Sequence, residues 1–341
     1  MTYGIGGGVA DAIFAQICQL RYYFGHFSWF SVFALQGCLK MLCSIILNGK
    51  HLPTKQSNVV VPWWSFTKPV LATAALTLVR DGLIQLDDQV QEGPFTLRQL
   101  LKHQAGLADY SELQEYHAAV AESQVPWPAA EMMQRLDGTR LRYAPGAAWR
   151  YSNVGYMLVA KLIERITGLS IEKALARRVF LPLGLTHARL AKTQEDLGEV
   201  YSENISSYHP GWVYHGLLVG PLSESTVLLN HLLTGQLLPP SLLQEMQHAI
   251  VLGGSMPGRP WATPGYGLGL MIGGTKSGHM LTGHTGVGPS GVIAVFHCSS
   301  GHNVATCSVF DEGGDEGQVE AKVLERLLIA VGAEKQVGEA Q

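Results

Sequence analysis

The sequence PWWSFTKP at residues 62–69, followed by VLATAALTLV at residues 70–79, decides how the rest of the chain is interpreted. The second run is apolar or small on every side, which predicts a buried helix. Pro69 fits the first turn of such a helix, where its missing N–H costs little. Residues three apart on a helix are surface neighbours, so we expect the Ser65 hydroxyl and the Lys68 amine to share a hydrogen bond at the helix start.

A serine and a lysine in this relation can carry out nucleophilic chemistry. A serine hydroxyl is a weak nucleophile until a base removes its proton. A lysine among apolar groups loses solvation, its pKa falls, and it can serve as that base near neutral pH. The free N–H groups of a helix N-terminus can stabilise a developing oxyanion. The tetrad alone is weak evidence, because Ser-x-x-Lys recurs at residues 170–173, which we interpret as an ordinary helix start.

Composition narrows the class of protein. The chain has 341 residues, of which 47% are apolar and 15% charged, so we expect a sizeable core in one or two domains. The 24 basic and 27 acidic residues give a net charge of −3, without any basic run. This balance argues against nucleic acid and anionic lipid as partners.

Cysteine and histidine usage gives no sign of a metal or other cofactor, and we expect none. The cysteines are odd in number and lack a C-x-x-C pair, which indicates buried thiols in a reducing compartment. They are Cys18, Cys38, Cys43, Cys298 and Cys307. No secretory signal is evident, which favours the cytoplasm but leaves the compartment open. Residues 27–47 are apolar, but Gly37 and Lys40 interrupt them, so we expect two strands rather than a membrane span.

Hydrophobic periodicity predicts a mixed architecture. The expected helices span residues 10–24, 95–101, 156–167 and 318–331, with a helical pattern over 111–190 and two more helices within 217–247. The expected strands span residues 29–35, 41–47, 266–272, 280–285, 292–297 and 304–310. Strands at both ends with helices between them predict an α+β fold, an antiparallel sheet flanked by helices with an inserted helical domain. We expect residues 1–90 and 260–341 to form the sheet domain and residues 91–259 the helical domain.

Two further motifs carry residues suited to the same chemistry. Tyr151 and Asn153 follow the turn-rich loop at residues 143–146; a tyrosine beside a lysine can be a phenolate that shuttles protons, and the asparagine can donate to a substrate carbonyl. The sequence GHTGV at residues 283–287 ends a predicted strand, where glycines let a substrate approach. The Val287 N–H can then complete an oxyanion hole with the Ser65 N–H. Each motif alone is also explained by ordinary loop packing.

In this order, the three motifs resemble the serine β-lactamase and penicillin-binding superfamily, and specifically its class C β-lactamase-related group of peptidases and esterases. The resemblance covers roughly residues 28–330 and is specific in combination. Further similar segments are LVRDG at 78–82, LLKHQAGL at 100–107 and LPLGL at 181–185.

The resemblance implies an active site in the cleft between the sheet and the helical domain, without a metal. It also implies an acyl-enzyme on Ser65, with Lys68 and Tyr151 as the proton-transfer pair. The expected oxyanion and substrate contacts are Trp64, Asn153, His284, Thr285, Gly286 and Val287. Two residues depart from the family pattern. Trp64 stands where glycine is common and can narrow the cleft, and His284 stands where typical β-lactamases carry lysine, so a substrate carboxylate is held less firmly.

The function expected from these features is a serine hydrolase that forms an acyl-enzyme on an ester, amide or peptide. A carboxylesterase, a D-peptidase and a weak β-lactamase all fit, and the substrate is a small molecule or a peptide. The alternative is a catalytically weak relative that binds peptide or cell-wall fragments in the same cleft. The sequence leaves the oligomeric state open.

Overall fold

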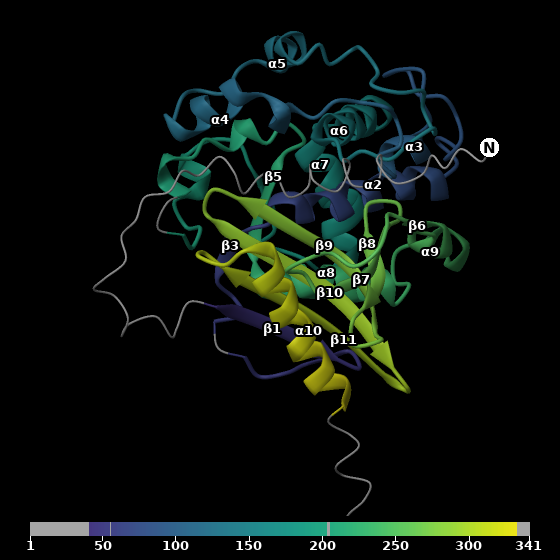
Figure 1. Ribbon diagram of the computed structural model, residues 1–341, viewed down its shortest axis with the longest axis vertical. Helices are drawn as coiled ribbons and strands as arrows, with labels where there is room; N and C mark the ends of the chain where they lie inside the picture. Colours follow the sequence, from purple (N-terminus) through teal and green to yellow (C-terminus); the bar gives the residue numbers. More distant parts are fainter. Residues whose placement is uncertain (1–40, 55, 203–204, 333–341) are drawn as a thin grey trace, which may run out of the picture. The chain divides into compact units, whose positions relative to one another are not determined.

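The computed structural model of the chain describes residues 41–54, 56–202 and 205–332 (Figure 1). The helix expected at residues 10–24 and the strand expected at 29–35 lie outside the described residues, as do Cys18 and Cys38. Of the other cysteines, Cys298 and Cys307 are buried and Cys43 is half-buried, all as free thiols. No helix in the described ranges is both long and apolar enough to cross a bilayer.

A large antiparallel sheet is the main framework, with its strands in the order β2-β1-β11-β10-β9-β8-β7-β6. The strands are β1 (Leu42–Leu47), β2 (Lys50–His51), β6 (Ile250–Val251), β7 (Trp261–Tyr266), β8 (Met271–Thr275), β9 (Met280–Gly288), β10 (Gly291–Ser300) and β11 (Asn303–Asp311). Strand β1 pairs with β11, with Ile45 opposite Cys307, so early and late parts of the chain share one sheet. The expected antiparallel sheet is confirmed.

The strand expected over residues 266–272 is wrong in its bounds, because the chain breaks between β7 and β8. Gly269, within the break, has φ +81°, a conformation that favours glycine. A Cβ there would come within 2.4 Å of the Ala72 Cβ. The break therefore lets the chain pass close to the buried helix.

Helices cover both faces of the large sheet. Ser308 in β11 bonds to Ser225 and Thr226 of α8 (Leu222–Leu233), whereas the Asn303 amide donates to the Val331 carbonyl of α10 (Glu316–Gly332). Successive strand residues point to opposite faces, so α8 and α10 lie on opposite sides. Figure 1 shows α10 lying across the strands. Helix α8 falls within residues 91–259, so this part of the expected helical domain packs on the sheet instead.

A second, small sheet of order β3-β5-β4 was not expected. Its strands are β3 (Val60–Pro62), β4 (Arg189–Ala191) and β5 (Leu217–Pro221). Residues 217–221 were expected to be helical, and that prediction is wrong. They are fully buried and pair on both sides, so tertiary contacts override the local pattern. The two helices expected in the rest of that segment are α8 and α9 (Pro240–Gln247).

Every residue from Thr67 to Leu78 of helix α2 (Thr67–Arg80) is buried, as expected. The remaining helices are α3 (Leu97–Leu101), α4 (Gln114–Ala121), α5 (Ala129–Arg135), α6 (Asn153–Thr167) and α7 (Ile171–Leu175), followed by the π-helical turn η4 (Ala176–Phe180). Of these, α6, α7 and η4 pack against α2. Short 3-10 turns are η2 (Trp64–Phe66), η3 (Tyr110–Glu112), η5 (Leu181–Leu183), η6 (Glu195–Leu197), η7 (Ile205–Ser207) and η8 (Pro210–Trp212). Helix α6 begins where the Ser152 hydroxyl accepts from the Gly155 N–H, and it ends at Gly168 with φ +65°.

Candidate active site

Ser65 is held in a tight turn just before the buried helix. It lies in the 3-10 turn η2, and Lys68 lies in the first turn of α2. Trp64 has φ +41°, which is uncommon for a residue other than glycine. The Trp63 N–H donates to the Leu218 carbonyl at 2.8 Å, which ties the turn to β5. Ser65 thus lies in a constrained turn that is hydrogen-bonded to β5.

The structure brings Ser65, Lys68 and Tyr151 together. Lys68 Nζ lies 3.1 Å from Ser65 Oγ, and Tyr151 OH lies 3.0 Å from the same oxygen. The lysine side chain is 0% exposed. Burial lowers the pKa of Lys68 from 10.5 to about 7, although the nearby Asp109 carboxylate opposes the shift. A large fraction of Lys68 is therefore a neutral amine at neutral pH.

Tyr151 differs in charge state from the phenolate expected from the sequence. Burial raises the pKa of the Tyr151 hydroxyl well above its ordinary value, so the phenol stays protonated. The charge of Asp109 adds to this effect. The Tyr151 hydroxyl therefore donates its O–H to Ser65 Oγ.

Asn153 is oriented by Asp109, a residue that the sequence analysis missed. The Asn153 amide nitrogen donates to both carboxylate oxygens of Asp109, at 3.1 and 3.2 Å. Its amide oxygen accepts a hydrogen bond from Lys68 Nζ at 2.7 Å, so Asn153 connects the lysine to Asp109. Asp109 also forms a capping box with Glu112, and the D-x-x-E spacing at residues 109–112 is a signal that could have singled it out.

The strand β9 lies directly against the serine turn. A Cβ at Gly286 would come within 2.8 Å of the Ser65 nitrogen and 2.6 Å of the Trp63 carbonyl oxygen. Among the strand pairs that the structure describes, β8 accompanies β9 only as far as Gly283. Residues 284–288 thus continue past β8 beside the nucleophile, and the Val287 side chain is 39% exposed.

A chain of hydrogen bonds links β9 to the helical part. The Ser152 N–H donates to His103 Nδ1 at 3.1 Å, so the proton of a neutral His103 is on Nε2, 3.2 Å from Tyr266 OH. Tyr266 OH in turn lies 3.1 Å from His284 Nε2, and His284 Nδ1 lies 2.7 Å from the Thr285 carbonyl oxygen. A backbone donor at one end and a backbone acceptor at the other fix every proton between them.

His284 and Thr285 are therefore placed differently from the direct substrate contacts that we expected. His284 is 2% exposed, both of its ring nitrogens are bonded within the protein, and burial lowers its pKa to about 3. The Thr285 hydroxyl donates to the buried Glu320 carboxylate at 2.5 Å. Glu320 is in turn paired with Arg259. These side chains hold the strand in place, which leaves its backbone to face the serine.

The Trp64 side chain is buried beside the serine turn, where it packs against Tyr208 and β9. It is 3% exposed and meets the Tyr208 ring edge-on, at a centroid distance of 5.4 Å. A Cβ at Gly288 would lie 2.3 Å from the Trp64 ring. The Trp64 ring is thus buried against β9, and narrowing of the cleft by Trp64 stays a prediction.

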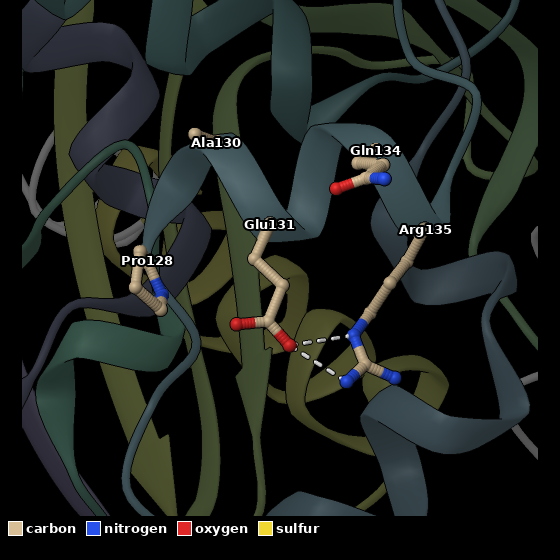
Figure 2. Close-up of a pocket in the computed structure, with 5 residues that line it drawn as sticks. All are labelled: Pro128, Ala130, Glu131, Gln134 and Arg135. Carbon is tan, nitrogen blue, oxygen red and sulfur yellow. Dashed lines mark hydrogen bonds and ion pairs between the residues drawn. The ribbon is translucent and has the colours of Figure 1, made fainter.

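A separate surface hollow of about 750 Å³ lies along α5 (Figure 2). It is lined by Pro128, Ala130, Glu131, Gln134 and Arg135. Figure 2 shows Arg135 bonded to Glu131, and the Arg135 guanidinium also lies 4.2 Å above the Trp127 ring. These charges are already compensated by one another, and none of the residues around Ser65 lines this hollow. In the described ranges, no group of three His, Cys, Asp or Glu side chains is placed to hold a metal ion.

Curated proteins with similar sequences are hydrolases and penicillin-binding proteins by name. A D-aminopeptidase of Brucella anthropi is 27% identical over 266 residues, which cover 75% of this chain and 49% of the relative. A penicillin-binding protein of Bacillus subtilis is 29% identical over 171 residues, which cover 47% of this chain and 36% of the relative. The chain therefore spans less than half the length of these relatives.

Solved structures share the fold. A D-stereospecific amidohydrolase from Streptomyces sp. superposes with a TM-score of 0.69 at 22% identity, covering 92% of this chain and 96% of the other. A D-amino acid amidase from Ochrobactrum anthropi, complexed with L-phenylalanine amide, gives a TM-score of 0.68 at 20% identity, covering 88% and 95%. Residues 49–306 match the beta-lactamase family. Since that match covers most of its length, the chain belongs to the beta-lactamase family.

Proposed function

We propose that this chain is a serine amidase or peptidase in which Ser65 forms the acyl-enzyme. The observation that carries the proposal is the placement of Ser65 Oγ, 3.1 Å from the amine of Lys68 and 3.0 Å from the hydroxyl of Tyr151. A base with a pKa of about 7 and a protonated phenol then flank one hydroxyl. A protein that merely binds ligand would not need a buried lysine whose neutral form faces a serine.

Acylation follows from these positions. The neutral Lys68 amine takes the Ser65 proton as Oγ attacks the substrate carbonyl carbon. The carbon–nitrogen bond of the substrate then breaks, and the leaving nitrogen receives a proton from the Tyr151 hydroxyl. The proton held by Lys68 then returns to the Tyr151 oxygen, which leaves the lysine neutral again. The net transfer is one proton, from Ser65 to the leaving amine.

The oxyanion is proposed to accept from the Ser65 and Val287 backbone N–H groups. The tight approach of Gly286 to the Ser65 nitrogen supports this, because it brings that part of β9 next to the serine. In deacylation a water molecule attacks the ester carbonyl, Lys68 takes its proton, and the proton returns to Ser65 Oγ as the acid product leaves. Asp109 and Asn153 keep the lysine in position in both steps.

The substrate class is proposed from charge and from the relatives. The position where a cation is expected holds a neutral, fully bonded His284, so no free carboxylate on the substrate is needed. The relatives named above are a D-aminopeptidase and a D-amino acid amidase. Amides and esters of D-amino acids, and short peptides of them, are accordingly the first substrates to test.

The test compares hydrolysis of D- and L-phenylalanine amide, p-nitrophenyl esters and nitrocefin by the wild type and by Ser65→Ala. We expect amide and ester hydrolysis by the wild type, poor nitrocefin hydrolysis, and none by the variant. If nitrocefin is the best substrate, the proposed class is wrong. Equal hydrolysis by Ser65→Ala would remove Ser65 from the mechanism.

A further inference from the structure

Lys68 has a third polar neighbour, which the mechanism above does not use. His215 Nε2 lies 3.4 Å from Lys68 Nζ, while Ser65 Oγ lies at 3.1 Å and Asn153 Oδ1 at 2.7 Å. His215 is 147 residues further along the chain than Lys68. It is buried, and no sequence motif drew attention to it.

Both of the other neighbours can accept a hydrogen bond from the lysine, Asn153 through its amide oxygen and His215 through Nε2. Asn153 presents its oxygen, because its amide nitrogen is occupied by the Asp109 carboxylate. His215 is a neutral ring, since burial and the charge of Lys68 lower its pKa well below the ordinary value. When Nε2 of a neutral imidazole accepts, Nδ1 carries the proton. His215 Nδ1 is buried and has no hydrogen-bond partner in the described residues.

This set of acceptors determines where the lone pair of Lys68 points. A neutral amine has two N–H donors and one lone pair. If Asn153 and His215 each accept one N–H, the lone pair is directed to the remaining neighbour, Ser65 Oγ. Without His215, the amine can turn an N–H toward the serine and its lone pair away, an arrangement that cannot accept the serine proton.

We propose that His215 is a positioning residue that holds the lone pair of neutral Lys68 on the Ser65 hydroxyl. The inference rests on the proposed function, in which Lys68 is the base. In the tautomer in which Nε2 accepts, the buried Nδ1–H has no partner among the described residues, a cost that a phenylalanine of similar shape would avoid. The His215 ring therefore offers one thing that an apolar ring does not, an acceptor for Lys68.

The backbone around His215 is firmly attached to the nucleophile segment. The Gly216 N–H donates to the Val213 carbonyl at 2.7 Å, which closes the turn that carries His215. Two residues further on, Leu218 accepts from the Trp63 N–H at 2.8 Å, and its own N–H donates to the Thr67 hydroxyl at 3.2 Å. The ring and the lysine are thus held by one rigid unit.

The test uses His215→Phe, which keeps the ring but removes the acceptor, and His215→Gln, which places an amide oxygen near the position of Nε2. His215→Asn is the matched short amide, which does not reach Lys68. For each we would measure kcat and KM for p-nitrophenyl acetate, the rate of labelling by a fluorophosphonate, and the thermal midpoint.

We expect His215→Phe and His215→Asn to lose about ten- to a hundredfold in kcat with KM within about twofold, and His215→Gln to recover most of the loss. In His215→Phe the acidic limb of kcat/KM should also move to lower pH, because the Lys68 ammonium loses an acceptor. The other titratable groups that face Lys68 stay in place in every variant. They are Asp109, Tyr151, Tyr156, His103 and His284.

Wild-type kinetics in His215→Phe would overturn the inference. A second contradicting result would be an equal loss of kcat in all three variants, in proportion to the fall in thermal midpoint and with an unchanged pH profile of kcat/KM. That pattern would describe a purely structural residue. A wild type that neither hydrolyses the ester nor becomes labelled would instead overturn the proposed function itself.

Discussion

The tetrad Ser-x-x-Lys occurs twice in this chain, and the two copies lie in opposite environments. Lys68 is fully buried, with its amine 3.1 Å from the Ser65 hydroxyl, and burial lowers its pKa to about 7. Ser170 is the exposed N-cap residue before α7, and Lys173 is exposed in that short helix. The Ser170 side chain makes no capping bond. The spacing is the same, so the two lysines differ through burial and through the groups beside them.

The largest expected effect on kcat comes from replacing each of the two lysines by methionine in separate variants. Lys68→Met should lower kcat by at least about a hundredfold, because the base is lost while the apolar stem is kept. Lys173→Met should leave kcat unchanged within about twofold. The measurement is steady-state hydrolysis of a p-nitrophenyl ester, with circular dichroism to verify folding. Near-normal turnover by Lys68→Met would show that the first tetrad is no more catalytic than the second.

A second expected effect concerns strand β9, which lies beside the first tetrad at Ser65. In Gly286→Ala the new methyl group would overlap the Ser65 nitrogen and the Trp63 carbonyl, so β9 or the serine turn must shift. We expect a loss of about ten- to a hundredfold in kcat, approaching the effect of losing one oxyanion donor.

Gly313→Ala is the matched control for this strand variant, since no atom lies within 4 Å of a Cβ at that position. It should retain wild-type kinetics. If Gly286→Ala retains them as well, the approach of β9 to Ser65 does not matter for the chemistry.

The pH dependence should also separate the two lysines. With a Lys68 pKa of about 7, the neutral amine increases as pH rises, so kcat/KM should rise roughly tenfold between about pH 6 and pH 8 and then level off. The rate rises with pH in this interval because burial disfavours the charged form of the lysine and brings its pKa down to about 7. The Lys173→Met variant should give the same profile as the wild type. A profile that falls over this interval would contradict a neutral lysine base.

The smallest expected effect comes from the hydrogen-bond chain behind β9. Tyr266→Phe removes the hydroxyl between His103 and His284 and leaves two buried ring nitrogens without partners. We expect a loss of about 1–3 kcal/mol in the free energy of unfolding and a few-fold loss in kcat.

Tyr214→Phe serves as the comparison in urea denaturation, because its half-buried hydroxyl has one bond, to the Trp127 carbonyl. It should cost less stability than Tyr266→Phe. Equal stability losses would mean that the His103–Tyr266–His284 chain contributes no more than an ordinary side-chain bond.

Much of the fold was predictable because its signals are local. The all-apolar run after Pro69 predicts a buried helix, and the late apolar runs separated by turns predict β9, β10 and β11. The strand β5 was not predictable in this way. Its residues pair with β3 and β4, which lie far away in the sequence, so that no local pattern distinguishes them from a helix.

In the candidate site, too, some features could be predicted from local motifs and others could not. Ser65, Lys68 and Tyr151 were found from motifs, and the structure places them around one oxygen atom. The parts played by Asp109 and His215 depend on contacts with distant residues, and the charge state of Tyr151 depends on burial. Spacing in the sequence contains neither kind of information.

The central claim is tested most directly by locating a covalent adduct. The wild type, Ser65→Ala and Ser170→Ala would be treated with a fluorophosphonate at about pH 8, where Lys68 should be mostly neutral, and analysed by intact mass and peptide mapping. We predict one adduct per chain on Ser65 in the wild type and in Ser170→Ala, and none in Ser65→Ala. An adduct on Ser170, or labelling that survives in Ser65→Ala, would contradict the account.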